Sequence, residues 1–192
     1  MTGNQPLHEP RGTTLIANAE IYNYIELRQD LPGVQFATQS DCEPPLHLYQ
    51  KHGINFAKKL RGMYAIAIYD AVKKRLVLSR DRFGIKPLYY CESDKYFAFA
   101  SEPRALLAAG LATREVNEAQ RNELLQLQFT CGRQTIFSII QRVMPGETLV
   151  VNAGRIAERR QLEMLPKAIE PTQSFASLDN AIETLDKTLE ES

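Results

Sequence analysis

A seven-residue segment near the middle of the chain, Met63–Tyr69, is apolar at both its odd and its even positions. Successive side chains of a strand point to opposite faces, so such a strand is expected in a sheet that is covered on both sides. A polar turn, Asp70–Lys74, leads to a second apolar run, Arg75–Arg80, and further short strands follow at Leu88–Cys91 and Tyr96–Ala100. This succession is typical of an antiparallel meander. The sequence therefore predicts an α+β domain with helices on the faces of a mostly antiparallel β core.

The same signals predict strands on either side of the meander. Short apolar runs at Thr13–Ala17 and Val34–Ala37 are interpreted as strands, and Met1–Gly12, with glycine or proline at four positions, as a loop. A last hairpin is expected from Thr148–Val151 and Arg155–Arg159, which flank an Asn-Ala-Gly turn.

Helices are predicted from apolar spacing and from end signals. The first covers Ile21–Arg28, before a Leu-Pro-Gly sequence that stops it. In the second, Ser40 is expected as the N-cap and forms a capping box with Glu43, and Gly53 ends the helix. Two further helices are expected at Glu102–Ala109 and Glu118–Leu127.

Composition restricts the partners of the chain. The 192 residues include 23 lysines and arginines and 23 aspartates and glutamates, so no general nucleic-acid field is expected. No apolar run approaches the roughly 18 residues of a membrane span, and Met1–Pro10 has no signal-peptide pattern. We therefore expect no nucleic-acid and no membrane partner. Three cysteines without paired spacing and three histidines predict neither a disulfide framework nor a metal site, and they favour the cytoplasm.

The C-terminal part differs in kind from the rest. Residues 166–177 are typical of a linker, and Ser177 is a good N-cap for a helix over residues 178–192. Apolar side chains recur at helical spacing in this helix, at Leu178, Ile182, Leu185 and Leu189. Such a stripe needs a surface to pack against. It either docks back onto the same domain or belongs to a further domain.

Two short segments carry candidate site residues. The segment Asn18–Glu20 lies where a strand gives way to a helix, and amide and backbone N–H groups at such a break can donate to a developing oxyanion. Asn and Asp are also common in ordinary turns. Asp41 stands beside a helix N-terminus, where its carboxylate can either bind a ligand ammonium group or simply accompany a capping box.

Seven motifs follow one another along nearly the whole chain. They are Gly3–Pro6, Asn18–Arg28, Ser40–Glu43, Leu60–Ala65, Arg80–Tyr90, Phe99–Glu102 and Met144–Gly146. In this order they resemble the glutaminase domain of glutamine-hydrolysing asparagine synthetases. The resemblance implies a class II, N-terminal-nucleophile glutamine amidotransferase domain at residues 1–165, with an αββα sandwich fold. It also implies that residues 178–192 are the first helix of a synthetase domain.

The resemblance implies a chemistry and a set of site residues. In this family an N-terminal cysteine attacks the side-chain amide of L-glutamine, and the ammonia serves an ATP-dependent amidation of aspartate. Asn18 matches the oxyanion-hole asparagine, and Ala19 stands where the family has a glycine whose N–H completes that hole. Glu20 is expected beside the bound glutamine, and Asp41 is expected to pair with its α-ammonium group. Any methyl group at a position of positive φ would cost on the order of 1 kcal/mol.

The sequence also departs from the family pattern. The family begins with Met-Cys-Gly and has two further segments before the Gly-x-Gln-Pro motif, at which this sequence opens. No Ser-Gly-Gly-x-Asp-Ser loop for ATP follows, so no cofactor is expected in this chain, and ATP and Mg²⁺ would belong to a synthetase domain. We therefore expect a domain truncated at both ends, with an incomplete sandwich and weak or absent glutamine hydrolysis.

Neither the cysteines nor the N-terminus offers a convincing replacement nucleophile. Thr2 lies in the wrong sequence neighbourhood, and Cys42 stands where the family usually has threonine, although a helix N-terminus would lower its pKa. Cys91 and Cys131 are expected as inert core residues. The charged cluster of Arg80, Asp81, Arg82 and Lys86 is interpreted as structural, with internal pairing around a sharp corner.

Two alternatives stay open, the first of them from a different functional class. One is a non-catalytic module that binds an amino acid through Asn18, Glu20 and Asp41, or a partner through an exposed strand edge. The other is one chain of a split amidotransferase. An unpaired edge, exposed apolar surface and the C-terminal helix also favour self-association.

Overall fold

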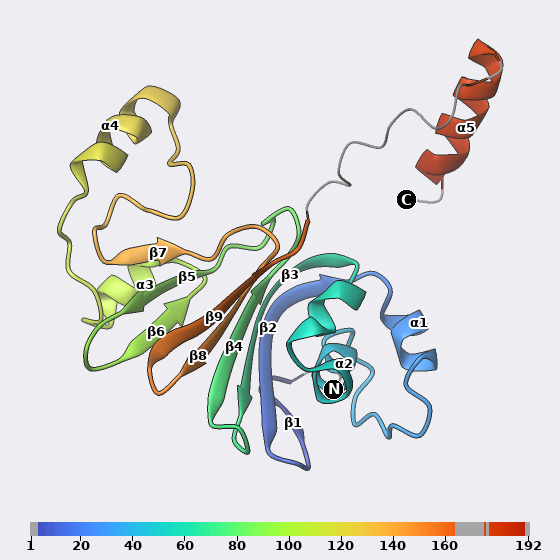
Figure 1. The fold of residues 1–192 in the computed structure, drawn as a ribbon, viewed down its shortest axis with the longest axis horizontal. Coiled ribbons are helices and arrows are strands. Elements are labelled where there is room, and N and C mark those ends of the chain that lie inside the picture. The colour runs from blue at the N-terminus through green and yellow to red at the C-terminus, as the bar shows by residue number, and fades with distance from the viewer. Residues whose placement is uncertain (1–3, 164–174, 176, 191–192) are drawn as a thin grey trace.

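The computed structural model describes residues 4–163, 175 and 177–190, and its strands form two antiparallel sheets. The larger sheet has the spatial order β1 (Leu7–Glu9), β2 (Thr13–Ile21), β3 (Gly62–Asp70), β4 (Arg75–Arg80), β8 (Glu147–Asn152) and β9 (Arg155–Gln161). The smaller sheet has the order β6 (Phe97–Ala100), β5 (Tyr89–Glu92) and β7 (Ile140–Arg142). Figure 1 shows the two sheets side by side in the body of the molecule.

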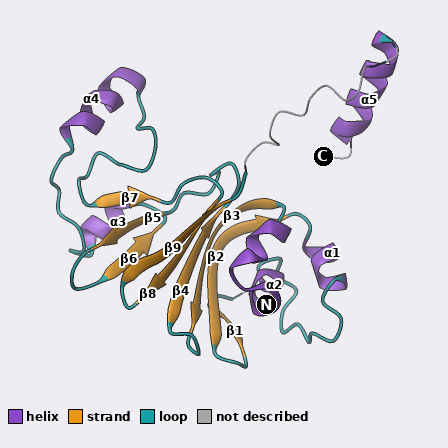
Figure 2. Ribbon diagram, viewed as in Figure 1, coloured by secondary structure: helices purple, strands orange, loops and turns teal. Residues whose placement is uncertain are grey.

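Helices cover the outer faces of both sheets, as Figure 2 shows. On the larger sheet lie α1 (Tyr24–Gln29), α2 (Glu43–His52) and the 3₁₀ helix η1 (Gly53–Lys59). On the side of the smaller sheet lie α3 (Pro103–Ala108) and α4 (Glu118–Leu127). The order helix, sheet, sheet, helix is that of an αββα sandwich, as predicted.

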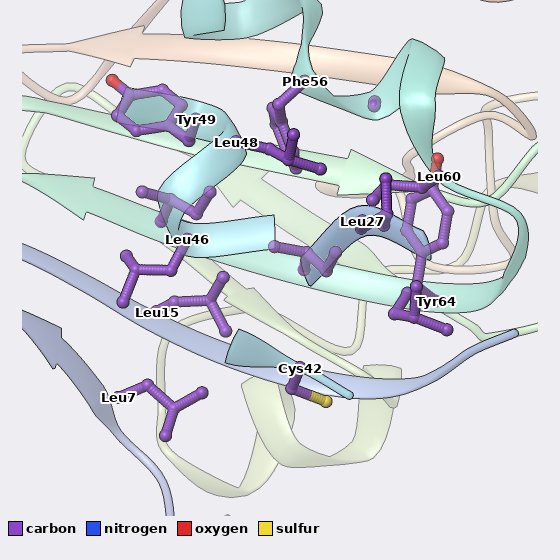
Figure 3. Packing of buried hydrophobic residues seen from close by; sticks show 14 of the residues in the cluster. Leu7, Leu15, Leu27, Cys42, Leu46, Leu48, Tyr49, Phe56, Leu60 and Tyr64 are labelled. Atoms are coloured by element: carbon purple, nitrogen blue, oxygen red, sulfur yellow. The ribbon is translucent and has the colours of Figure 1, made fainter. Parts of the chain in front are cut away.

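The two apolar faces of β3 explain why this strand lies inside the sandwich. Ile66 and Ile68 point to the helical layer and join a buried cluster with Leu46 of α2, part of which Figure 3 shows. Ala65 and Ala67 point to the other side and join a second buried cluster with residues of the smaller sheet and of β8, among them Leu88, Tyr90 and Leu149. The prediction of a strand covered on both sides is confirmed.

Four predictions about the first fifty residues were wrong. The first helix does not begin at Ile21, because β2 continues through Asn18–Glu20 to Ile21 and α1 begins at Tyr24. Val34–Ala37 is not a strand, and β1 interrupts the loop predicted for the first twelve residues. Helix α2 begins at Glu43 with Cys42 as N-cap, so Ser40 and Glu43 form no capping box. The Glu43 carboxylate accepts hydrogen bonds from the N–H groups of Ala37 and Thr38 instead, at 2.6 and 2.7 Å. The buried Glu43 carboxylate thus supplies the acceptors that these backbone N–H groups would otherwise find in a neighbouring strand.

The charged corner after β4 is structural, but its groups bond to the backbone. The Arg80 guanidinium donates to the carbonyl oxygens of Lys86, Gly84 and Val143, at 2.6 to 2.8 Å. The Asp81 carboxylate accepts from three N–H groups of the same corner, those of Phe83, Ile85 and Lys86. These bonds satisfy polar groups of a loop that has no sheet partner.

The last helix, α5 (Leu178–Glu190), has the N-cap that the sequence predicts, because the Ser177 hydroxyl accepts from the Asn180 N–H at 3.2 Å. Leu178, Ile182 and Leu185 are more than half exposed. Most of the predicted linker, 166–177, lies outside the described residues.

No helix of the described ranges has the length and apolar character needed to cross a membrane.

Candidate functional site

The outer edge of β2 is capped by three different partners along its length. Strand β1 pairs only with the first residues of β2, up to Leu15. At Ala17 the side chain of Gln5 continues the ladder, because its Nε2 donates to the Ala17 carbonyl at 2.8 Å and its Oε1 accepts from the Ala17 N–H at 2.6 Å. At Ile21 the N–H donates to Asp41 Oδ2 at 2.7 Å. Between Gln5 and Asp41, no residue that the structure describes bonds to this edge at Ala19.

The backbone of Ala19 points toward this opening. Its partner on β3 is Tyr64, whose carbonyl accepts from Asp81 N–H at 2.8 Å and whose N–H donates to Asp81 Oδ2 at 3.3 Å. Both Tyr64 groups therefore face away from β2, so the pair is of the non-hydrogen-bonded kind and the Ala19 N–H faces the outer edge. Among the described residues, none accepts a hydrogen bond from it. An N–H group of this kind is ready to donate to a ligand.

The expected conformational cost at Ala19 is absent. The non-glycine residues with positive φ in the described ranges are Lys74, Gln128 and Ala153. Ala19 keeps the extended backbone of β2, and its methyl group packs against the buried cluster of the helical layer. Alanine in place of the family glycine therefore retains the N–H donor without strain.

Asn18 and Glu20 project from the opposite face of β2, because alternate residues of a strand share a face. Asn18 lines a cavity of about 310 Å³ between the two sheets, together with Gln5, Leu88, Phe99 and Ser101. Within the described part of the chain, its amide has no hydrogen-bond partner. Glu20 is largely exposed, and its Oε1 lies 3.8 Å from Lys86 Nζ. The Asn18 amide and the Ala19 N–H thus belong to neighbouring residues of β2, the first at the cavity between the sheets and the second at the outer edge of the strand.

The loop before α2 holds Asp41 at the end of β2. Arg28 of α1 donates from Nη2 to the carbonyls of Thr38 and Ser40, each at 2.9 Å, and its guanidinium stacks 4.2 Å from the Phe36 ring centroid. Burial alone would raise the pKa of Glu43, but hydrogen bonds from Thr38 and from the Ala37 N–H outweigh it and lower that pKa. The ionised Glu43 carboxylate and the Arg28 guanidinium therefore both hold the loop before α2 by hydrogen bonds to its backbone.

The backbone spacing along β2 between the Asp41 contact at Ile21 and Asn18 is close to the length of an extended amino acid. Asp41 is bonded at Ile21, three residues beyond Asn18, and three residues of strand cover about 10 Å. With bonds of about 1.5 Å, an extended glutamine separates its ammonium from its amide by about 6 Å, and a hydrogen bond of about 2.9 Å is added at each end. At this spacing, a carboxylate can accept from the ammonium group of such a molecule, and two N–H groups can donate to its amide oxygen.

The cysteines do not supply a reactive thiolate to this corner. Burial, and then the charge of Asp41, raises the pKa of Cys42 to about 11, so a position at the start of α2 does not activate it. Cys91 is buried, and burial raises its pKa. The prediction that Cys131 is a core residue was wrong, because this cysteine is exposed in the loop after α4. Its pKa is raised, by desolvation and by Glu123.

Two contributors to the site were not predicted as such. Gln5 belongs to a motif of the sequence, but only the structure shows that its side chain pairs with Ala17. Arg28 likewise ends a motif, and its contacts to Thr38 and Ser40 connect segments that are ten and twelve residues apart. Within the described residues, no group of three or more His, Cys, Asp or Glu side chains is placed to hold a metal ion.

Comparison with known proteins shows the family to which the chain belongs. Residues 1–161 match the family model of the glutamine amidotransferase domain. The glutamine-hydrolyzing asparagine synthetases 2 and 1 of Bacillus subtilis are 44% identical over 118 residues and 38% identical over 152 residues, which are 61% and 78% of this chain. The chain spans only 16% and 24% of the lengths of these two proteins.

A solved structure shares the fold. The glutamine phosphoribosylpyrophosphate amidotransferase of B. subtilis superposes with a TM-score of 0.58 at 24% identity, over 82% of this chain and 31% of that chain. The superposition supports the sandwich architecture of the described residues.

Proposed function

The chain belongs to the family of glutamine amidotransferase domains, and we propose that it is the glutamine-binding part of an asparagine-synthetase-type enzyme. In such an enzyme, ammonia from the glutamine side chain is used for ATP-dependent amidation of aspartate. The names of the two B. subtilis relatives support this assignment. ATP and Mg²⁺ would bind to a synthetase domain, and the cytoplasm is the proposed compartment.

The observation that carries the proposal is the open Ala19 N–H between Gln5 and Asp41. In the proposed complex, Asp41 accepts from the α-ammonium group of L-glutamine, and the Asn18 amide and the Ala19 N–H donate to its side-chain carbonyl oxygen. Glu20 lies beside the ligand on the same face as Asn18. Donors placed in advance around that oxygen would stabilise the negative charge that develops on it when a nucleophile attacks the amide carbon.

We further propose that the 192 residues alone hydrolyse glutamine weakly or not at all. Attack on an amide needs an activated nucleophile close to the oxyanion donors. Of the described cysteines, two are buried with raised pKa values and the third, Cys131, also has a raised pKa. The proposed role of this chain by itself is therefore to bind glutamine.

A second candidate function rests on strand β6. Within the described residues β6 is an end strand of the smaller sheet, and a cavity of about 550 Å³ beside it is lined by Ile16, Tyr69, Phe97 and Phe99. An extended segment of another chain can add to such an edge and cover the apolar side chains. The domain would then be a partner-binding module, or one chain of a split amidotransferase.

Calorimetric titration of the purified chain with L-glutamine tests the first proposal. We expect saturable binding that Asn18→Ala weakens by about tenfold, the value of one hydrogen bond to the ligand. Asparagine, which is one methylene shorter, is the matched control ligand and is expected to bind more weakly. Absence of heat with millimolar glutamine would contradict the binding role. Ammonia release at a normal amidotransferase rate would contradict the absence of hydrolysis.

A further inference from the structure

A second surface near the end of β2 combines exposed apolar side chains with cations. Tyr22, Phe83 and Ile85 are 60%, 63% and 57% exposed. They border a surface cavity of about 460 Å³ that also exposes basic groups. We call the following seven lining residues the basic patch: Tyr22, Lys58, Arg61, Arg82, Phe83, Ile85 and Leu162.

The charge of the basic patch is not neutralised within the described part of the chain. No aspartate or glutamate is among the residues that line its cavity. The side chains of Lys58, Arg61 and Arg82 form neither an ion pair nor a hydrogen bond with any described residue. Apolar contact area surrounded by free cations is suited to an acidic, amphipathic partner.

Helix α5 has the complementary chemistry. Its apolar stripe includes Leu178, Ile182 and Leu185, which are 76%, 57% and 59% exposed. Its other side chains include four acids and one base, which are Asp179, Glu183, Asp186, Glu190 and Lys187. A helix of thirteen residues is marginal by itself in water, so it gains stability when its apolar face is buried.

The chain connects these two surfaces directly. Leu162 follows β9 and lines the basic patch, so the chain leaves the body of the domain at the patch itself. Fifteen residues lie between Leu162 and Leu178, and an extended chain of that length covers about 50 Å. Attachment to the same chain gives α5 an effective concentration on the order of millimolar at the patch.

We propose that α5 is an intramolecular ligand of the basic patch. In Figure 1 the helix lies apart from the sheets. Its apolar side chains Leu178, Ile182 and Leu185 are exposed. In the docked state the stripe covers Tyr22, Phe83 and Ile85, and the acidic side chains of α5 pair with Lys58, Arg61 and Arg82. This contact is independent of glutamine binding, and it covers the surface next to the end of β2.

Amide hydrogen exchange of α5 in the full 192-residue chain tests this proposal. We expect the amides of residues 178–190 to exchange at least about tenfold more slowly than those of a peptide of residues 175–192. In the double variant Arg61→Glu/Arg82→Glu this protection is lost. In the matched control Arg104→Glu/Arg114→Glu, on exposed arginines within and after α3, it is kept. Adding Glu183→Arg/Asp186→Arg to the first variant restores it.

Three results would overturn the proposal: exchange of α5 at the rate of the peptide, protection that Arg61→Glu/Arg82→Glu leaves unchanged, or protection that rises with chain concentration. The last result would assign the patch to α5 of a second copy. Exchange of the β3 amides in the same samples shows whether each variant is folded. If the charge variant unfolds, Tyr22→Ser/Phe83→Ser is expected to remove the protection of α5 through loss of apolar contact.

Discussion

The Ile21 N–H and the Asp41 carboxylate form a 2.7 Å hydrogen bond across twenty residues of sequence. This bond joins the end of β2 to the loop before α2, so the strand and the helical layer meet at the candidate site. Oδ2 of Asp41 is used in this bond, and in the proposed complex the carboxylate also accepts from the ammonium group of the ligand. The same residue therefore links the fold to the proposed binding of an ammonium group.

Asp41→Asn separates these two roles. Asparagine keeps an oxygen that accepts from Ile21 N–H but loses the negative charge. Since a hydrogen bond to a charged group contributes about 1.5–3 kcal/mol, we expect glutamine affinity to fall by about 10- to 100-fold, with little change in the free energy of unfolding. Calorimetry and urea denaturation measure the two quantities. Asp30→Asn, at an exposed helix end, is the control and is expected to bind like the wild type.

Gln5→Ala tests the capping of β2 at Ala17. The change removes both hydrogen bonds between the Gln5 amide and the Ala17 backbone, which we expect to lower the free energy of unfolding by about 1–2 kcal/mol. The rate of hydrogen exchange at the Ala17 amide should rise by the factor that corresponds to the same free energy. Exchange at Ala17 that does not change would show that another group holds this edge of the strand.

The central strands could be predicted because their signal is local. The apolar character of Met63–Tyr69 at every position follows from burial on two sides, and the structure places Ile66 and Ala67 in different clusters. The ordered motifs were equally informative, since the family match covers residues 1–161. The roles of Asn18, Ala19, Glu20 and Asp41 toward glutamine remain predictions.

What the sequence could not show depends on contacts between distant residues. Val34–Ala37 has the composition of a strand, but the Glu43 carboxylate binds the N–H of Ala37 and leaves no ladder to form. The strand β1 is three residues long and depends on pairing with β2 for its existence. Cys131 was expected in the core, yet its loop follows the surface. In each case contacts between residues distant in sequence determine the local structure, and the local sequence pattern carries no information about those contacts.

The thiols are expected to react in a fixed order. Cys42 and Cys91 are buried and have raised pKa values, whereas Cys131 is exposed. Because alkylation needs an accessible thiolate, we expect iodoacetamide at pH 8 to label Cys131 first and the other two only after unfolding. Mass spectrometry of proteolytic fragments identifies the site. Rapid labelling of Cys42 in the folded chain would contradict its burial and reopen a nucleophilic role.

Glu147 should dominate the acid sensitivity of the fold. Its side chain is 2% exposed and accepts from both Nη atoms of Arg133, at 2.8 and 2.7 Å, and from Arg159 Nη1 at 3.1 Å. Burial alone would raise the pKa of Glu147, but the hydrogen bonds from Arg133 and from the Met144 N–H outweigh it and lower that pKa. A lowered pKa in the folded state stabilises the fold above the ordinary value of 4.5. This stabilisation is lost as the pH falls from about 4.5 through the lowered pKa.

Glu147→Gln therefore has a pH-dependent effect on stability. At pH 7 we expect the free energy of unfolding to fall by about 3–5 kcal/mol, because Arg133 and Arg159 then lack a buried counter-charge. The loss should shrink as the pH falls below the lowered pKa, because wild-type Glu147 then becomes protonated and loses its own ion pairs. Denaturant titrations at pH 7 and at a series of decreasing acid pH values measure the difference. Glu158→Gln, which removes a surface partner of Arg160, should change stability by no more than about 0.5 kcal/mol. A loss that stays constant with falling pH, even where the wild type itself has lost the stabilisation by Glu147, would show that shape, and not charge, makes Glu147 important.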